Sequence, residues 1–483
     1  MMDAASRFFQ LLVGALPQAG VLQDVCLSVC DSDTRRWLQL KIVDMDADAV
    51  YQSPETWVVI YTALAAMIDG RQASNAITSV VMTADGTIVS TSWDESNDIT
   101  PGTFYAPPAD YQLARPAVPT IRRDHLVELR RLGPFADLVA PLSSPSEQLV
   151  FKHYETHLFL TDVWCSIHIM AGLRDHAHIV PIQHLVTHED CGGVVGFTMP
   201  FLPGGTLQDT LASRPFKLKW AKQLFQTLDD LNLQHGIDHR DIRLRNLIVD
   251  PATDNLVIID LGSARSRGRV GTTCVPPAAL QPRESQGPLS WLAFLPPSSS
   301  EEEEKARARH IKMETDEDVN AAIATLHGLV TRDPTDWSWE GESGLWRGRG
   351  IDDITAAPWT AHPDVRLDSP AEAYRAALND WLKQRRADPR YPNGPSTPLD
   401  FPRHMPIPRG DTVHVQGYQP PIATNGDEEL ADQAVVSGYN FFRRDAVRAG
   451  RAVVEWARPL ASDVDPARTL LANGQYADDG AKQ

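Results

Sequence analysis

The spacing of apolar residues predicts a small α+β unit at the start of the chain. Alternating apolar and polar positions predict four strands, at residues 21–29, 37–43, 77–82 and 87–92. A longer apolar run at 57–68 predicts a helix that ends near Gly70. Ala84-Asp85-Gly86, between the last two strands, is a strong hairpin signal. We expect residues 1–118 to form this unit, whose role is unknown, with a Pro- and Ala-rich linker at 100–119.

Beyond residue 119 the pattern changes to short strands followed by longer amphipathic helices. Strands are predicted at residues 126–132, 138–142, 149–152 and 194–201, with a turn at 133–137. Helices are predicted at residues 155–173, 218–235, 318–329 and 374–386. In the second helix a Trp, Phe and Leu stripe at helical spacing is typical of a core-facing side. We therefore expect a second folded unit over residues 119–400.

Three later stretches lack such a pattern. Residues 278–311 are predicted to be an insertion, and the run Ser298–Glu304 within it predicts disorder or, alternatively, a phospho-acceptor tract. Residues 389–421 are Pro-rich and irregular. In the C-terminal segment, 401–483, we expect a mostly helical stretch at 427–456 and a frayed tail over the last twenty residues.

The most informative stretch runs from His239 to Asn246 and reads H-R-D-I-R-L-R-N. Two apolar, β-branched runs follow it, at 247–249 and 256–259, and turn-forming residues separate them. A hairpin there returns Asp260, the first residue of Asp-Leu-Gly, to the side of Asn246.

Composition and charge narrow the class of protein. Hydrophobic residues make up 42% of the 483 residues and charged residues 22%, as in ordinary globular proteins. The net charge of −18 argues against binding to nucleic acid or to an anionic membrane. Five scattered cysteines indicate a reducing compartment. No apolar run reaches the roughly 18 residues that span a bilayer, and no signal-peptide pattern precedes the apolar patch at 8–15, so we expect the cytoplasm or nucleus.

These motifs resemble those of the protein-kinase superfamily over roughly residues 120–390. His239–Asn246 is similar to the catalytic loop H-R-D-x-x-x-x-N, and Asp260-Leu261-Gly262 to the metal-binding turn, with Leu for the usual Phe. The resemblance implies an α+β, bilobal protein-kinase-like fold to which the N-terminal unit is added. The small lobe would span about 120–200 and the large lobe about 201–400.

A narrower resemblance points to a group of largely uncharacterised fungal kinase-like proteins. The segments that carry it are 122–124, 216–220, 229–233, 245–255 and 362–368. It implies ATP binding and identifies no substrate.

The superfamily resemblance implies a role for each of several residues in a reaction that uses ATP and Mg²⁺. Asp241 would orient a substrate hydroxyl, Asn246 and Asp260 would hold the metal, and Arg243 would assist the γ-phosphate. Lys152, which ends the run Leu-Val-Phe-Lys, would hold the α- and β-phosphates. The acceptor would be a protein hydroxyl, so a protein substrate or signalling partner is expected, with no nucleic acid and no membrane.

The resemblance also implies the residues that surround the nucleotide. They are Gly133, Val139 and Val150 on the small-lobe strands, Met199 as the gatekeeper, and the Pro200 carbonyl and Leu202 amide facing adenine. Asp318 would brace the catalytic loop from a later helix.

Three features depart from the kinase pattern. The phosphate-binding loop keeps only Gly133, followed by Pro134, the bulky Phe135 and then Asp137, which is negative beside triphosphate. Ser166 stands where a helix glutamate would pair with Lys152, so the lysine is expected to lose that orienting ion pair. Arg243 stands where Ser/Thr kinases usually carry Lys.

The sequence therefore leaves three hypotheses open. The first is an ATP- and Mg²⁺-dependent protein kinase, directed at Ser or Thr, with full or reduced activity. The second is a pseudokinase that uses the same fold as a binding or scaffold module. The third is a small-molecule phosphotransferase, against which Arg240 and Asp318 argue. The oligomeric state is not predicted.

Overall fold

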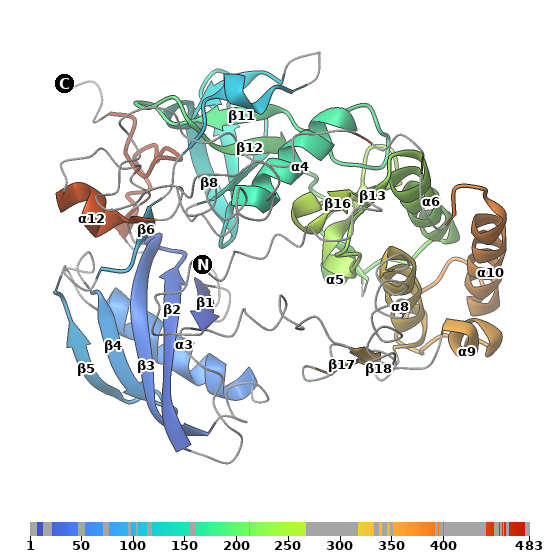
Figure 1. Cartoon of the computed structure of the whole chain (residues 1–483), viewed down its shortest axis with the longest axis horizontal. Coiled ribbons are helices and arrows are strands. Elements are labelled where there is room, and N and C mark those ends of the chain that lie inside the picture. The colour runs from blue at the N-terminus through green and yellow to red at the C-terminus, as the bar shows by residue number, and fades with distance from the viewer. Residues whose placement is uncertain are drawn as a thin grey trace, which may run out of the picture.

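The computed structural model of the chain, drawn in Figure 1, describes most of the regions that carry the predicted elements. The described residues are 7–12, 22–46, 54–70, 77–94, 98–102, 105–113, 118–154, 160–211, 213–266, 317–332, 338–340, 345–347, 351–391, 395, 399, 441–448, 454, 456, 458–459 and 463–478. Among these residues, none of the helices combines the length and apolar character that crossing a bilayer requires.

The first unit is a five-stranded sheet with one helix packed against it (Figure 1). Its elements are β1 (Phe8–Leu12), β2 (Leu22–Asp31), β3 (Arg36–Asp46), α3 (Pro54–Asp69), β4 (Ser79–Thr83) and β5 (Ile88–Ser92). The strands lie in chain order, and β3 and β4 are parallel because α3 crosses between them. The four predicted strands and the predicted helix are confirmed, and β1 is an additional strand.

One face of this sheet is buried against α3. The buried positions alternate along the strands and recur every fourth residue on the helix: Leu40, Ile42, Val80, Met82, Ile60, Leu64 and Ile68. The predicted hairpin turn closes where Thr83 N donates to Thr87 O at 3.0 Å, with Gly86 at φ +85°. A residue without Cβ adopts this left-handed backbone without strain.

The second unit is built on a six-stranded sheet whose order is β7-β11-β12-β10-β9-β8. The strands are β7 (Thr120–Arg122), β8 (Leu126–Gly133), β9 (Ala136–Pro141), β10 (Leu149–His153), β11 (His184–Thr187) and β12 (Val194–Pro200). A short 3₁₀ turn, η4 (Arg123–His125), joins the first two, and α4 (Leu160–Gly172) follows β10. The four predicted strands of this unit are confirmed, while β7 and β11 were not predicted.

The segment expected to be a linker at 100–119 instead packs into the second unit. β6 (Pro101–Gly102) pairs with β19 (Phe441–Phe442), and η3 (Pro108–Tyr111) is a 3₁₀ turn. The buried Tyr105 hydroxyl donates to Tyr154 O at 2.9 Å, and the buried Tyr111 hydroxyl lies 3.3 Å from the Tyr154 hydroxyl. Two aromatic residues with buried hydroxyl partners outweigh the Pro and Ala content that predicts a linker.

The tail predicted to be frayed is paired along the outer edge of β8. Glu128 N donates to Leu470 O, and Ala472 N donates to Leu126 O, each at 2.9 Å. Leu470, Leu471 and Ala472 are buried. The prediction of a frayed end was wrong because these residues satisfy the free edge of the sheet, which otherwise exposes unpaired backbone groups.

The third part of the chain is mainly helical (Figure 1). Its helices are α5 (Leu207–Thr210), α6 (Leu218–Asp229), which continues as a π-helical turn η6 (Asp230–Gln234), α8 (Glu317–Thr331), α9 (Ile351–Ala356) and α10 (Ala371–Ala387). The helix α12 (Arg443–Arg448) lies instead beside β6, directly after β19 (Figure 1). Its short strands and 3₁₀ turns are β13 (Ile237–Asp238), η7 (Leu244–Asn246), β14 (Leu247–Asp250), β15 (Asn255–Ile258), η8 (Leu261–Ser263), β16 (Arg265–Ser266), β17 (Ser338–Glu340) and β18 (Leu345–Arg347).

The helices predicted at 218–235, 318–329 and 374–386 are confirmed as α6 with η6, α8 and α10. The predicted insertion at 278–311 lies outside the described residues. So does most of the Pro-rich stretch at 389–421 and of the predicted helical stretch at 427–456, in which β19 and α12 are described. The fold is α+β, with separate sheets and a helical part.

Helices α6 and α10 are joined by a stacked ring pair and a buried ion pair. The rings of Phe225 and Trp381 stack with centroids 4.6 Å apart. The almost fully buried Arg385 forms an ion pair with Asp229, which also accepts from Trp381 Nε1 at 2.9 Å. Arg385 Nη2 donates to Asn232 Oδ1 at 2.7 Å, so α10 contacts the end of α6 through charge as well as packing.

We predict that Arg385→Ala lowers the free energy of unfolding by about 3–5 kcal/mol, because it leaves the half-buried Asp229 carboxylate without its partner. The matched control is Arg390→Ala, which removes a more exposed pair with Asp388 and should cost less than about 1 kcal/mol. Chemical denaturation of both variants measures the difference. Equal losses in the two variants would contradict the assignment.

Candidate active site

The loop at residues 239–246 is held by one buried carboxylate. Asp318, near the start of α8, accepts from His239 N and Arg240 N at 2.7 Å each and from Asn232 Nδ2 at 2.9 Å. Asp318 is almost fully buried, and hydrogen bonds to a carboxylate are strong where water is excluded. The backbone of the loop is therefore fixed by a helix that follows it by more than 70 residues.

Two residues of the site adopt left-handed backbone that non-glycine residues rarely populate. Arg240 has φ +65° and Asp260 has φ +61°. Such conformations cost about 1–3 kcal/mol each and persist where the surroundings fix them. At Arg240 the bond from its amide to Asp318 does so, and the Asp260 side chain accepts from Gly262 N at 3.3 Å.

Asp241 is oriented from both sides. Asn246 Nδ2 donates to the Asp241 backbone oxygen at 2.8 Å and to its Oδ2 at 2.7 Å. Arg243 forms an ion pair with Oδ1, and Arg245 Nη2 lies 3.8 Å from Oδ2. The Asp241 side chain is 11% exposed, whereas those of Arg243 and Arg245 are 53% and 58% exposed. The carboxylate thus lies below two arginines that reach it from the solvent side.

The predicted hairpin brings Asn246 and Asp260 together. β14 and β15 pair in register from Leu247 with Ile258 onward, and Ile259 N donates to Asn246 O at 2.9 Å. Both hydrogens of the Asn246 side-chain amide are used on Asp241, so its oxygen remains as an acceptor.

Asn246 and Asp260 offer few protein oxygens, which suits a cation that also binds water and phosphate. Within the described residues, no group of three or more His, Cys, Asp or Glu could hold a metal ion by itself. A cation at Asn246 and Asp260 would therefore take further oxygen ligands from phosphate and water. Mg²⁺ behaves in this way, since it is usually bound through one or two carboxylates plus substrate phosphates. The residues present fit Mg²⁺ in that role.

Lys152 on β10 forms an ion pair with Asp260. Burial acts to raise the pKa of the Asp260 carboxyl, but the charge and hydrogen bond of Lys152 outweigh it, and the pKa lies below its usual value. The sequence predicted that Lys152 lacks the ion pair with a helix glutamate, and a carboxylate from another segment takes that place. Asp260, 108 residues later in the chain, supplies it.

Helix α4, which follows β10, carries no acidic residue at the position where the sequence analysis placed a partner for Lys152. α4 begins at Leu160, and its residues from Val163 to Gly172 contain neither Asp nor Glu. Ser166, at the position counted for the glutamate, is buried. The lysine therefore pairs with Asp260 and not with this stretch of the helix.

The strand register decides which small side chains share a face with Lys152. In the pairing of β9 with β10, Leu138 lies opposite Val150 and Ala136 opposite Lys152. Since side chains alternate along a strand, Val139 points to the other face, together with its partner Leu149. The position predicted for Val139 therefore belongs to Leu138, one residue earlier. Val150 lies on the same face as Lys152.

The turn between β8 and β9, where the sequence predicted a phosphate-binding loop, is short. Gly133 pairs with Ala136, so that only Pro134 and Phe135 connect β8 to β9. Phe135 O accepts from His153 N at 3.0 Å, and the Phe135 ring meets the His153 ring edge-on at 6.4 Å. His153 follows Lys152 and points to the opposite face. The turn is thus tied to the back of the sheet.

Asp137 also lies on that opposite face. It pairs with Phe151 and is buried, with the Arg35 guanidinium of the N-terminal unit bound to its carboxylate. The expectation that Asp137 stands beside a triphosphate was wrong, because the register turns its side chain away from Lys152. Its charge is balanced within the protein.

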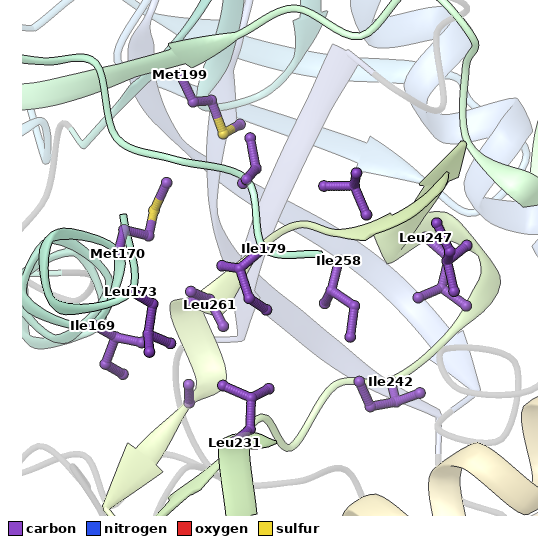
Figure 2. Close-up of a cluster of buried hydrophobic side chains, with 14 of the residues drawn as sticks. Ile169, Met170, Leu173, Ile179, Met199, Leu231, Ile242, Leu247, Ile258 and Leu261 are labelled. Carbon is purple, nitrogen blue, oxygen red and sulfur yellow. The ribbon is translucent and has the colours of Figure 1, made fainter. Parts of the chain in front are cut away.

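Met199 and Pro200 are the last two residues of β12, and Leu202 lies two residues beyond it. Met199 pairs with Val150, and Figure 2 shows its side chain above a cluster that includes Met170 of α4, Ile179 and Leu261. Phe201 N donates to Gln148 O at 3.1 Å, which makes that pair hydrogen-bonded and the neighbouring pair of Pro200 with Leu149 non-bonded. The Pro200 carbonyl therefore points away from β10.

The cluster in Figure 2 connects the sheet, α4 and the loop residues. Its labelled members are Ile169, Met170, Leu173, Ile179, Met199, Leu231, Ile242, Leu247, Ile258 and Leu261. Each is buried. Leu261, directly after Asp260, packs in it, so the position of the Asp260 turn is coupled to α4 through apolar contact.

The sequence analysis missed two residues around this site, Leu138 and Arg35. Leu138 was missed by one position, and only the strand register distinguishes it from Val139. Arg35 was missed because it lies 102 residues before its partner Asp137, with no local signal that relates them. Its position after a turn and its unusual φ of +54° are visible only in the structure.

Comparison with known proteins gives a distant structural likeness. No family model matches the chain, and no curated protein matches it. Among solved structures it is similar to the Cydia pomonella granulovirus kinase PK-1, with 21% sequence identity and a TM-score of 0.25. The likeness covers 30% of this chain and 53% of that chain, about half of its length. The function must therefore be argued from the site.

We predict that Asp318→Asn lowers the free energy of unfolding by about 2 kcal/mol or more and loosens the 239–241 backbone. An amide places hydrogens where an oxygen accepts from three N–H groups. Asp364→Asn, in an 82% exposed side chain, is the control. Urea denaturation and hydrogen exchange of the loop amides are the measurements. Unchanged exchange in Asp318→Asn would show that the loop does not depend on this carboxylate.

His168 on α4 predicts a pH dependence of stability. Its ring lies 4.6 Å from that of Trp164, and burial lowers its pKa from 6.5 to about 4. The unfolded chain binds this proton below pH 6.5 and the folded chain does not. Stability is therefore fully present above that value and is lost by about 3 kcal/mol as pH falls toward 4. His168→Phe should flatten this part of the pH profile, measured by urea unfolding at pH 7 and pH 4.5; an unchanged profile contradicts it.

Proposed function

We propose that the protein is a protein kinase that transfers the γ-phosphate of ATP to a protein hydroxyl, Ser or Thr, with Mg²⁺ as cofactor. The observation that carries the proposal is the convergence of Asp241 and Asn246 of one loop, Asp260 of the turn after β15, and Lys152 of β10. Phosphoryl transfer depends on positioning and charge stabilisation more than on covalent chemistry by the protein. A fixed loop with two carboxylates, an amide and a lysine meets those needs.

Each residue has a defined task in this reaction. Asp241, held by Asn246, orients the acceptor hydroxyl and receives its proton. Asp260 and Asn246 offer the oxygen ligands for Mg²⁺, which when bound neutralises phosphate charge. Lys152 is already beside Asp260 and holds the α- and β-phosphates, and Arg243, whose side chain is half exposed, turns from Asp241 to the γ-phosphate.

The nucleotide would lie against the Lys152 face of the six-stranded sheet. Leu138, Val150 and Met199 form its apolar wall, and the Pro200 carbonyl and Leu202 amide face the adenine edge. Gly133 is at the rim, where an added Cβ would meet nothing within 4 Å. Cytoplasm or nucleus, where ATP is plentiful, is the compartment that this proposal requires.

A second function, binding without transfer, is favoured by one observation. The turn between Gly133 and Ala136 has two residues, one of them Pro134, which lacks an amide hydrogen, and Phe135 O is bonded to His153 N. Such a turn offers few backbone amides to a triphosphate. A pseudokinase that serves as a scaffold would have this turn and keep the remaining geometry. The arrangement of Arg240 and Asp318 gives no support to a small-molecule phosphotransferase.

Asp241→Asn separates the two functions. We predict that it lowers the rate of phosphate transfer to a protein substrate by about 100-fold or more, because the amide cannot accept the hydroxyl proton. Stabilisation by Mg-ATP should persist, at about 2.7 kcal/mol when ATP is at 100 times its dissociation constant. Asp260→Asn should weaken the Mg²⁺-dependent part of that stabilisation. Asp364→Asn, remote and exposed, is the control for both.

Thermal unfolding with and without Mg-ATP, and incorporation of labelled phosphate, measure these quantities. Stabilisation of the wild-type chain without any transfer would select the pseudokinase. Transfer that survives in Asp241→Asn would remove the catalytic role of this residue.

A further inference from the structure

The N-terminal unit reaches the second unit through the turn between β2 and β3. Asp31 organises this turn by accepting from Arg7 Nε at 2.7 Å, from Asp33 N at 2.9 Å and from the Thr34 hydroxyl at 2.9 Å. Arg35 then adopts φ +54°. An arginine in left-handed backbone is strained, and such conformations persist where contacts fix them. The turn is built so that Arg35 projects out of its own sheet.

Arg35 is buried in the other unit. Its guanidinium forms an ion pair with Asp137 on β9 and donates to Ala472 O at 3.2 Å. Glu128 Oε2 on β8 lies 3.8 Å away, and the Trp456 ring centroid lies 5.7 Å from the guanidinium carbon. Arg35 and Asp137 are 2% and 1% exposed. The two charges are therefore removed from water together, and either alone would be costly.

A second contact joins the same turn to β8. Arg131 Nη1 donates to Asp33 Oδ1 at 3.2 Å, and Arg131 Nη2 donates to Asp33 O at 3.4 Å. The turn thus grips both strands of the β8–β9 hairpin, Arg131 on one and Asp137 on the other. This hairpin carries the short turn that stands where a phosphate-binding loop would be.

The position of Asp137 transmits this contact to the nucleotide face. Its neighbours Ala136 and Leu138 pair with Lys152 and Val150, and they point to the face opposite that of Asp137. A shift of Asp137 therefore shifts the wall against which the nucleotide lies. His153, beside Lys152, also faces Asp137, with Nε2 at 3.3 Å from Oδ2.

We propose that Arg35 is a positioning residue for the nucleotide-facing side of the sheet, so that the N-terminal unit holds the β8–β9 hairpin in its binding position. The proposal gives residues 7–94 a role, and its part about nucleotide affinity rests on the proposed function. The pairing replaces the flexibility of a glycine-rich loop with a hairpin fixed from behind. Ligand binding at Lys152 then depends on a contact made on the other face.

The experiment compares Arg35→Ala, Arg35→Lys and Lys41→Ala in the full chain. Lys41→Ala removes a half-exposed pair with Asp24 on the same sheet and is the control. We expect Arg35→Ala to speed hydrogen exchange of the 131–139 amides by about tenfold or more, with smaller changes in α6 and in β14–β15. Mg-ATP affinity, from thermal unfolding, should fall by about tenfold. Arg35→Lys should recover part of both, since it keeps the charge and loses the fork.

Equal acceleration across the hairpin, α6 and β14–β15 would overturn the proposal, because it would show a structural role alone. Unchanged exchange at 131–139 would overturn it as well. If wild-type protein shows no Mg-ATP stabilisation, the proposed function fails, and the exchange data still decide the role of Arg35. Should Arg35→Ala not fold, Asp33→Asn removes the charge that faces Arg131 and is expected to speed hairpin exchange about threefold; no change would count against the proposal.

Discussion

One carboxylate fixes the backbone on which the rest of the site depends. Asp318 accepts from two consecutive loop amides and from the side chain of Asn232, and Asp318, Asn232 and His239 are all buried. Because the amide of Arg240 is held, this residue remains at a φ it would not otherwise populate. The direction in which Asp241 leaves the loop follows from that conformation. Asn232 in turn accepts from Arg385, so the helical part supports the loop through a continuous chain of hydrogen bonds.

The two faces of the β9–β10 pair carry different sets of residues with different contacts. Lys152, Val150 and Leu138 share the face beside Asp260, while Asp137 and His153 lie on the reverse face, where Asp137 contacts both His153 and Arg35 of the N-terminal unit. Alternation along a strand makes this division strict, since a residue cannot contribute to both faces. The apparent defects of the turn sequence, an acid and a bulky aromatic, are residues of the reverse face.

Much of the fold could be predicted from the sequence, because the signals are local. The hairpin at 247–258 is specified by two apolar runs and a turn, and α6 by its Trp and Leu spacing. The prediction of the site was wrong where the answer depended on residues far apart in the sequence. Whether residue 138 or residue 139 shares a face with Lys152 depends on the register of β9 against β10. A shift of one residue would turn each side chain to the other face. The partner of Lys152 lies on another segment, and the Ala- and Pro-rich stretch near Tyr105 is ordered by contacts with Tyr154 and Trp456.

The pairing of residues 470–472 with β8 has a consequence for the order in which the chain matures. During synthesis β8 emerges some 340 residues before the segment that covers it, and Arg35 meets Ala472 across 437 residues. Contacts of such sequence separation form late and slow folding. The edge of β8 is therefore open on the ribosome until residues 470–472 have been made. Nascent chains with that edge uncovered present a template for strand addition, and a chaperone that shields it would act at this stage.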